Sequence, residues 1–537
     1  MLSNTLWQIG PRVQSLSRQK SLLLKTIAVL LVAVMMLPFF HLMLRALGSD
    51  ASTWEAYLRF RTFSTLISTI SLAVSVTLFG IALAVPSAWL VCRTDLPGRR
   101  IWATLLALPL AIPSYVAGFA FIAALGPRGF LHQALANLPV TISFPGITGF
   151  SGALFALTMI TYPYIFLTTA AAFQRLDPSF EDSARVLGLG SMKSFLFVTL
   201  PLLRPAITAG ALLSSLYALS DFGAVALMRF ETFTQAIYVQ YSSSLDRSLI
   251  ALFGLTLVLV TISILWLENR SRGKSRYYRL GAGAARRKTV ALGRWKYPSV
   301  ALLSLLPIVS LGLPVGNVLY WTLRGTSSEH LAILDLAQRA FNSVAVSGLA
   351  AAAAVGVAIP ITALTTRKKS AFNTFIEAAS YSGYALPGIV LALSLVFFAA
   401  NYTSLIYQSL LLLIIAYVLH FIPAAIGSIR TSWLQLNPHL SESAHTLGHR
   451  STSVFTRISM PLLRPGIAAA AALVFLSVMK ELPATLLLGP TGFSTLATSI
   501  WAFTDEAMFA PAGPPALLLL ALASLPMYFL LPRLGSQ

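Results

Sequence analysis

Residues 176–207 read LDPSFEDSARVLGLGSMKSFLFVTLPLLRPAI, and residues 436–467 read LNPHLSESAHTLGHRSTSVFTRISMPLLRPGI. The two stretches align without a gap, 260 residues apart, and share the run Pro-Leu-Leu-Arg-Pro at 201–205 and 461–465. Each begins with a polar half, although only 10% of the residues in the chain are charged. A polar segment that recurs at a fixed spacing predicts a duplicated fold, in which the segment serves outside the apolar interior.

The rest of the chain is strongly apolar. Of its 537 residues, 56% are hydrophobic, and the mean hydropathy is +0.77. A soluble domain could not bury this much apolar surface, so a bilayer is the expected solvent. Continuous rather than alternating apolar runs predict helices instead of a barrel. We expect an all-α polytopic membrane protein with twelve transmembrane spans: 22–46, 65–91, 101–125, 150–174, 205–228, 247–267, 297–323, 338–364, 374–400, 406–430, 464–488 and 513–533.

The basic residues predict the orientation. With the N-terminus inside, the inner segments carry 29 of the 38 lysines and arginines, as expected for cytoplasmic loops. Both termini are therefore expected in the cytoplasm. The apolar run at 26–40 could be mistaken for a signal peptide, but we expect an uncleaved first helix because no small-residue cleavage site follows. Lysines and arginines spread over short loops do not favour a nucleic-acid partner.

The whole half is duplicated around the polar segments. Pro163 and Pro423 share the offset of 260, whereas Pro113 and Pro387 are separated by 274 because the first half has a longer outer loop. Six spans per half is an even number, so both copies point the same way. Parallel repeats of this kind are related by an axis along the membrane normal, and a transport pathway is expected on that axis.

Each polar segment should fold as a helix, a turn and a second short helix. Asp177-Pro178 and Asn437-Pro438 read as an N-cap followed by proline at N1. Gly188 and Gly448 are expected to end the first helix. A second short helix should follow and end at Pro201 in the first copy and at Pro461 in the second. An ordinary capped loop is the alternative, but two copies with equal spacing favour docking to a partner that has two equal sites.

The segments resemble the EAA motif of ABC-importer permeases, E-A-A-x-x-x-G-x9-I-x-L-P. In the first copy the matching residues are Asp182, Ser183, Ala184, Gly188, Val198, Leu200 and Pro201. In the second copy they are Glu442, Ser443, Ala444, Gly448, Ile458, Met460 and Pro461. Aspartate replaces glutamate in the first copy, serine replaces the first alanine in both, and methionine replaces leucine in the second. The resemblance implies that eleven residues couple the chain to an ATPase: Glu181, Asp182, Ser183, Ala184, Gly188 and Pro201 in the first copy, and Glu442, Ser443, Ala444, Gly448 and Pro461 in the second.

Fold, partners and location follow from this resemblance as expectations. It implies the type I ABC-importer permease fold in a bacterial inner membrane. A homodimer of ATPase subunits would bind on the cytoplasmic side and a substrate-binding protein on the outer side. The chain itself would be no enzyme and would bind no cofactor, since ATP and Mg²⁺ would sit on the ATPase. The expected divisions are 1–61 (N-terminus and first helix), 62–267 (first permease domain), 268–296 (basic linker), 297–337 (seventh helix and outer loop) and 338–533 (second permease domain).

A finer resemblance concerns the substrate. Residues 220–224, 232–234 and 480–485 look like those of fused, two-domain ferric-iron permeases. Thiamine permeases share the fused length and fold, so thiamine, a polyamine or another small solute stays an alternative to Fe³⁺.

Two carboxylates are candidates for the substrate pathway. Asp221 and Glu481 are equivalent at the offset of 260 and fall about 24 Å along the fifth span of each half. A carboxylate in the membrane costs about 2.5–3.5 kcal/mol, so it should face a cavity or a partner. A hard cation such as Fe³⁺ prefers oxygen ligands, so the pair could act as transient metal ligands. Alternatively, Asp221 caps a helix break at Gly223, and Glu481 pairs with a neighbour or caps a break at Pro483.

Other function classes are less consistent with the sequence. A secondary transporter should carry a relay of ionisable residues, yet the predicted spans contain only Asp221, Glu377, Lys480 and Glu481. A membrane-embedded enzyme lacks a paired histidine and acid in the spans. The single cysteine, Cys92, allows neither an intrachain disulfide nor a cysteine metal cluster.

Overall fold

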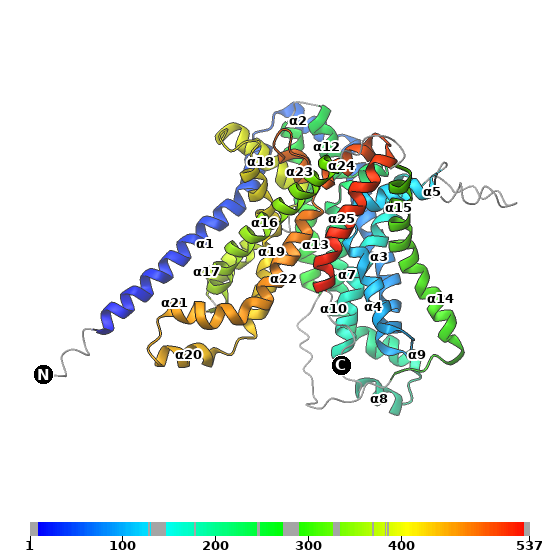
Figure 1. Ribbon diagram of the computed structural model, residues 1–537, viewed down its shortest axis with the longest axis horizontal. Coiled ribbons are helices and arrows are strands. Elements are labelled where there is room, and N and C mark those ends of the chain that lie inside the picture. Colours follow the sequence, from blue (N-terminus) through cyan, green and yellow to red (C-terminus); the bar gives the residue numbers. More distant parts are fainter. Residues whose placement is uncertain are drawn as a thin grey trace. The chain divides into compact units, whose positions relative to one another are not determined.

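The computed structural model describes residues 9–126, 129, 147–176, 179–243, 247–271, 289–325, 333–367, 370–381, 383 and 386–530. Every regular element in these residues is a helix, apart from one isolated bridge between Thr94 and Val290 (Figure 1). The helices form two compact units. The N unit comprises Ala46–Ala340 and Ser494–Gln537, and the C unit comprises Met1–Arg45 and Phe341–Phe493. Each unit therefore contains a segment from the opposite end of the sequence.

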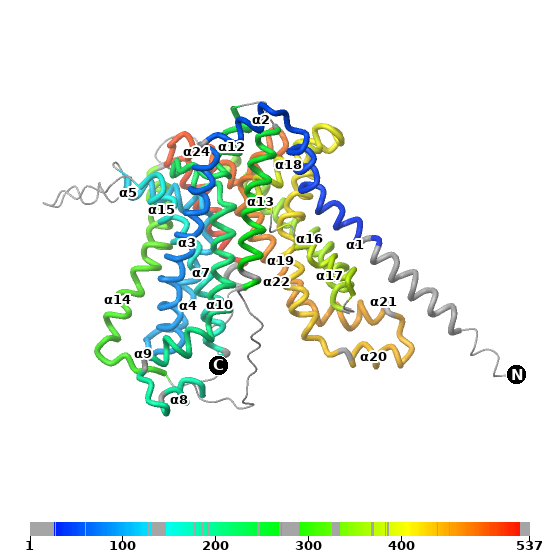
Figure 2. The backbone as a smooth tube through the Cα atoms, turned by 180° about the vertical axis from the view of Figure 1, so that it is seen from behind, coloured from blue at the N-terminus to red at the C-terminus, as the bar shows by residue number. Residues whose placement is uncertain are grey.

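The N unit contains most of the first half and the last helices of the chain, which can be followed from behind in Figure 2. Its helices are α2 (Ala51–Tyr57), α3 (Phe60–Arg93), α4 (Arg99–Ala107), α5 (Ser114–Leu125), α7 (Gly149–Arg175), α8 (Ser179–Val186), α9 (Ser191–Ser194), α10 (Leu200–Ser220), α11 (Gly223–Leu227), α12 (Phe233–Ser243), α13 (Arg247–Ser271), α14 (Lys296–Pro307), α15 (Leu313–Gly325), α24 (Leu496–Asp505) and α25 (Phe509–Leu530).

The C unit combines the first helix with most of the second half. Its helices are α1 (Ile9–Leu47), α16 (Ile333–Arg367), α17 (Ala371–Ser380), α18 (Gly388–Tyr402), α19 (Leu410–Leu434), α20 (Pro438–Thr446), α21 (Ser451–Val454), α22 (Met460–Met479) and α23 (Pro483–Leu488). The first turns of α16 belong to the N unit. Helix α1 is attached to α18, because the Ser394 hydroxyl donates a hydrogen bond of 2.7 Å to the carbonyl of Pro38. The Arg45 guanidinium also lies over the Phe397 ring.

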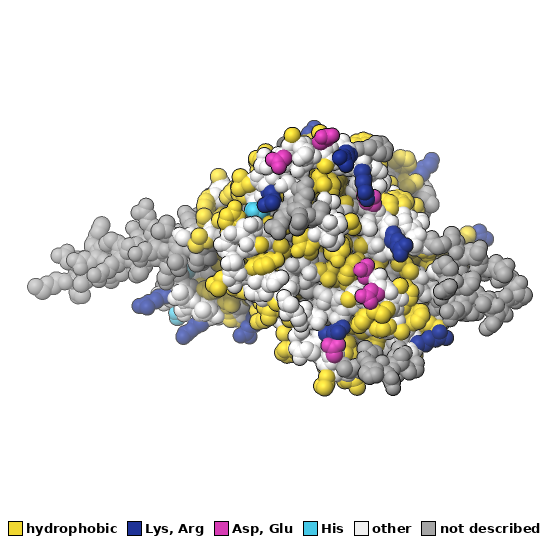
Figure 3. Space-filling view, turned by 90° about the horizontal axis from the view of Figure 1, so that it is seen from above, with side chains coloured by type: hydrophobic (Ala, Val, Ile, Leu, Met, Phe, Trp, Pro, Cys, Tyr) yellow, Lys and Arg dark blue, Asp and Glu magenta, His cyan; other side chains and the backbone are white. Residues whose placement is uncertain are grey.

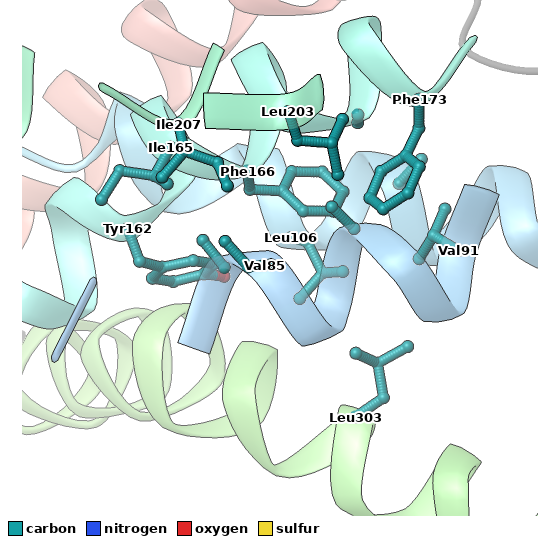
Figure 4. Packing of buried hydrophobic residues seen from close by; sticks show 14 of the residues in the cluster. Val85, Val91, Leu106, Tyr162, Ile165, Phe166, Phe173, Leu203, Ile207 and Leu303 are labelled. Atoms are coloured by element: carbon teal, nitrogen blue, oxygen red, sulfur yellow. The ribbon is translucent and has the colours of Figure 1, made fainter. Parts of the chain in front are cut away.

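A buried apolar cluster holds the N unit together (Figure 4). Phe166 on α7 lies at its centre, between Val85 of α3 and Leu203 of α10. Leu303 of α14 completes the cluster although it comes from the second half of the sequence. Burying one such side chain stabilises a fold by about 1.5–3 kcal/mol where water is the alternative. In a bilayer the gain comes from close packing instead.

Four predicted spans are interrupted. In the described residues, ten helices are long and apolar enough to cross a membrane, or eleven if α4 and the 3₁₀ turn after it count with α5 as one span. With that pair counted, 374–400 is the one of the twelve predicted spans that has no helix of this length in the described residues. The 101–125 span bends by 99° between Arg99–Ala111 and Ser114–Leu125. Pro113 and the equivalent Pro387 are extended N-caps, with ψ of 148° and 144°, because proline cannot donate a helical hydrogen bond. Predicted span 374–400 is likewise divided into α17 and α18.

The remaining two interruptions lie at the candidate carboxylates. Helix α10 ends at Ser220 and α11 begins at Gly223, within predicted span 205–228. Helix α22 ends at Met479 and α23 begins at Pro483, within predicted span 464–488. Each fifth span is thus a long helix followed by a short one.

Helices α7 and α10 approach each other at Gly210, which gives a first prediction. A Cβ atom at this position would lie 2.6 Å from Ile165 Cα and would also collide with Thr168 Oγ1. We expect Gly210→Ala to lower the thermal stability of the detergent-solubilised protein, because a backbone atom cannot give way and overpacking costs about 1–3 kcal/mol. At Gly348 on α16 an added Cβ meets nothing within 4 Å. Gly348→Ala should therefore stabilise slightly, as in an ordinary helix. Equal melting-temperature shifts for both variants would contradict the close approach.

Candidate functional site

The first polar segment, residues 179–199, is a helix closed by a left-handed glycine. Helix α8 ends at Val186, and Gly188 has φ of +86°. The N–H of Leu189 then donates to the carbonyl of Ala184 at 3.1 Å. This backbone pattern closes many helices with a glycine one position past the end. The predicted role of Gly188 as helix terminator is confirmed.

The second polar segment, residues 438–459, repeats this geometry. Gly448 has φ of +80°, and the N–H of His449 donates to the carbonyl of Ala444 at 3.0 Å. At the start of α20, Asn437 accepts a hydrogen bond from the N–H of His439, with Pro438 in the first turn. The predicted Asn437-Pro438 cap is confirmed. The predicted Asp177-Pro178 cap and the side chain of Asp182 lie outside the described part of the chain.

The second short helix does not stop at the proline, so that prediction is wrong. Residues Phe195–Thr199 and Phe455–Ser459 form π-helical turns that run without interruption into α10 and α22. Pro201 and Pro461 lie in the first turn of those long helices. A wider turn relieves the clash between a proline ring and the carbonyl four residues earlier. Each polar segment is therefore continuous with the fifth span of its half.

Each polar segment has an inner and an outer side. Ala184 and Ala444 of the motif are buried, whereas Ser183 and Ser443 are exposed. Leu187 and Leu447, just before the glycines, are 82% and 79% exposed. Glu442 is exposed too and contacts His439 of its own helix at 3.1 Å. In Figure 1, α8 lies at the end of the N unit away from α2, and α20 at the end of the C unit away from α18.

Glu181 has partners inside the chain. Its carboxylate forms an ion pair with Arg93, in the last turn of α3. It also accepts a hydrogen bond of 2.8 Å from the Thr199 hydroxyl. The Glu181 side chain is only 17% exposed, so it points into the N unit rather than toward a partner.

Asp221 caps the second piece of the broken fifth span in the N unit. Its Oδ2 accepts hydrogen bonds from the N–H groups of Ala224 and Val225, at 3.0 and 3.3 Å. The Ser114 hydroxyl, at the start of α5, is a third donor to this carboxylate. The side chain is 6% exposed. The capping alternative at Gly223 is therefore confirmed, and it leaves open whether the carboxylate also contacts a substrate.

Glu481 occupies the same place in the C unit. Its Oε1 accepts a hydrogen bond of 3.2 Å from the N–H of Ala484 and so caps α23, which confirms the capping alternative at Pro483. The same oxygen lies 2.8 Å from the point where a Cβ atom of Gly388 would stand. Behind it, the hydroxyls of Tyr417 and Thr485 are 2.6 Å apart. Both carboxylates thus cap a short helix piece, and each lies next to the first residue after an equivalent proline, Ser114 or Gly388.

The sequence does not predict the partners of these groups. Arg93 is one of many basic residues in the predicted inner segments, and nothing in the sequence relates Ser114 to Asp221 or Thr199 to Glu181. A hydroxyl or a terminal arginine has no sequence signature of its partner. In the described residues, no three His, Cys, Asp or Glu side chains group as a metal site.

The described chain is thus a polytopic all-α membrane protein. Its two equivalent halves each carry one exposed helix closed by a left-handed glycine and two interrupted spans. Comparison with protein families agrees with this architecture: residues 77–273 and 356–535 match the family described as binding-protein-dependent transport system inner membrane component. The chain belongs to this family of ABC-importer permeases, with the domain present twice.

Individual relatives extend the comparison. The chain is 34% identical to the Fe(3+)-transport system permease protein FbpB 2 of Haemophilus influenzae over 512 residues, which cover 94% of this chain and 97% of that protein. It is 24% identical to the putative ferric transport system permease protein FbpB 1 of the same organism, over 77% of this chain and 67% of that protein. The molybdenum transport system permease protein ModB of Escherichia coli is 32% identical over 27% of this chain and 63% of its own length.

Proposed function

We propose that this chain is the translocating subunit of an ATP-driven importer that takes Fe³⁺ from a binding protein and releases it into the cytoplasm. Two ATPase subunits would bind the two polar segments, and the chain would alternate between outward-open and inward-open states. The single observation that carries the proposal is the repeated geometry of the polar segments. Each presents an exposed leucine at a rigid turn and continues through a π-turn into an interrupted span.

The orientation follows from the charge bias of the loops. The polar segments and the basic linker fall on the side that the lysines and arginines assign to the cytoplasm, which is where ATP is available. The termini would lie on that side as well. The opposite end would receive the binding protein. Figure 3 is a view from above, in which acidic and basic side chains lie among hydrophobic ones.

Two observations support Fe³⁺ as the substrate: similarity to a named iron permease, and carboxylates at the interrupted spans. The relative that matches nearly the full length is named for Fe(3+) transport. The interrupted spans fit a cation for a physical reason. A bare helix N-terminus carries partial positive charge and would repel Fe³⁺. Asp221 and Glu481 place a full negative charge on the starts of α11 and α23, so we propose that they also serve as transient oxygen ligands.

Reconstitution of the complete importer tests the proposal. The chain would be purified with its ATPase, placed in liposomes and supplied with its binding protein, with or without Fe³⁺. We expect the iron-loaded binding protein to raise ATP hydrolysis severalfold and to drive iron into the liposomes, while the empty binding protein does neither. Stimulation only by a thiamine-loaded or polyamine-loaded binding protein would overturn the substrate. Failure of any ATPase to copurify would overturn the coupling role of the polar segments.

A further inference from the structure

The end of the linker between the two halves is fastened to the end of α3. The N–H of Val290 donates to the carbonyl of Arg93 at 2.8 Å, and the N–H of Asp95 donates to the carbonyl of Val290 at 3.1 Å. These two bonds make the parallel bridge between Thr94 and Val290. Backbone hydrogen bonds of this kind fix a register without depending on side-chain identity. The linker end is therefore part of the N unit rather than a loose tether.

Asp95 strengthens this attachment. Its Oδ1 accepts a hydrogen bond of 2.8 Å from the N–H of Leu292, and its Oδ2 lies 3.5 Å from Lys296 Nζ. The N–H of Leu292, and then Lys296, hold the pKa of Asp95 below its usual value. The carboxylate is therefore charged at neutral pH and keeps both contacts.

Arg93 connects this attachment to the first polar segment. Its carbonyl is held by the linker, while its side chain forms the ion pair with Glu181 of α8. Only 7% of the Arg93 side chain is exposed. A buried arginine needs its partner, because an uncompensated charge in such a place is strongly unfavourable. Thr199 also donates to Glu181, so the same carboxylate holds both ends of the polar segment.

The second polar segment does not repeat this arrangement. At the offset of 260, the residue equivalent to Glu181 is Ser441, which has no charge. The next residue, Glu442, is equivalent to Asp182 and contacts His439 within its own helix. The duplication thus preserved the turn geometry of the two segments, whereas the carboxylate that reaches Arg93 is present in the first copy alone.

We propose that residues 290–296, Arg93 and Glu181 form an anchor that fixes the first polar segment to α3 and to the linker, with Arg93 and Glu181 as positioning residues. The inference rests on the proposed coupling function. If the ATPase displaces the first polar segment, the anchor moves α3 and the linker end together with it. The second polar segment has no such anchor, so its displacement is transmitted through α22.

Hydrogen–deuterium exchange of the purified permease tests the anchor without any partner. We expect Arg93→Gln to speed exchange in residues 179–199 about tenfold and to leave residues 438–459 unchanged. The charge exchange Arg93→Glu with Glu181→Arg should restore most of the protection. Arg61→Gln is the matched control, since Arg61 pairs with Glu231 at the opposite end of α3 and both side chains are exposed. Unchanged exchange in Arg93→Gln, or equal acceleration in both polar segments, would overturn the anchor.

A backbone variant tests the linker separately. Val290→Pro removes the N–H that bonds Arg93, whereas Val290→Ala keeps it. We expect the proline variant alone to speed exchange in residues 179–199 and, in the reconstituted importer, to lower solute-stimulated ATP hydrolysis severalfold. If Val290→Pro behaves like Val290→Ala in both assays, the linker has no part in the anchor. Because the exchange assay needs neither ATPase nor solute, an error in the proposed function does not count against the anchor.

Discussion

The double variant Asp221→Asn with Glu481→Gln is expected to lower iron uptake by about tenfold or more, which corresponds to roughly 1.4 kcal/mol or more. Both replacements keep the shape of the side chain and an oxygen that can accept a hydrogen bond from the helix N–H groups. Asparagine is itself a good N-cap, so α11 should stay in place. What the variant removes is negative charge, and a trivalent cation that passes the short helices would then meet their partial positive charge alone.

Two controls separate charge from folding in this experiment. Glu231→Gln removes a carboxylate that is 44% exposed and paired with Arg61, so iron uptake should be unaffected. Asp221→Ala removes the cap itself and leaves the N–H groups of Ala224 and Val225 buried without an acceptor, a cost of about 1–3 kcal/mol. We therefore expect Asp221→Ala to melt at a lower temperature, whereas the double variant melts close to the wild type. Normal uptake by a folded double variant would mean that the two carboxylates only cap helices.

Much of the local geometry could be predicted from the sequence because short-range rules govern it. A glycine just past a helix and an Asn-Pro pair at its start act within one turn, and Gly188, Gly448 and Asn437 all behave accordingly. The all-α membrane fold and the two repeats follow equally well, since they depend on apolar run lengths and a constant offset. These features need no knowledge of which helices touch.

Predictions about helix continuity were less successful, and proline shows why. Pro163 and Pro423 lie inside unbroken helices, whereas Pro113 and Pro387 end up as extended caps between helix pieces. Neighbouring helices decide whether the freed carbonyl finds another donor or the chain turns away. Apolar length alone therefore predicts where the spans lie but not where a span breaks into two helices. The breaks after Ser220 and Met479 have no extended proline as the cap of the next helix. In each break, a carboxylate accepts a hydrogen bond from the start of the new helix, although Pro483 is also the first residue of α23.

Long-range partners were beyond the sequence for a related reason. The contact between Arg93 and Glu181 joins two different predicted inner segments, and no periodicity in the sequence relates the two residues. The assignment of α1 to the C unit and of α14, α15 and α25 to the N unit is a matter of tertiary packing. Glu181 shows the consequence for function: the motif placed it among residues that contact an ATPase, while the structure gives it partners within the N unit.

Replacing Gly188 or Gly448 with valine is expected to lower ATP-driven uptake by about tenfold or more at either position. Both glycines have positive φ, at +86° and +80°, where an ordinary L-residue costs roughly 1–2 kcal/mol and a β-branched residue more. The strain is purely conformational, because an added Cβ would meet nothing within 4 Å at either site. To escape it, the turn must open, which moves the exposed Leu187 or Leu447 away from the position that we propose docks to the ATPase.

Asparagine provides the matched control at each site, since it adopts left-handed backbone conformations readily. Gly188→Asn and Gly448→Asn should therefore retain about half or more of the uptake. ATPase copurification and ATP hydrolysis stimulated by the loaded binding protein should follow the same order, with valine far below asparagine. If the valine and asparagine variants transport equally well, the left-handed turn is not needed for coupling. If the valine and asparagine variants both lose transport, the absence of a side chain at the turn is what coupling requires. The partner would then have to contact the glycine directly rather than the leucine before it.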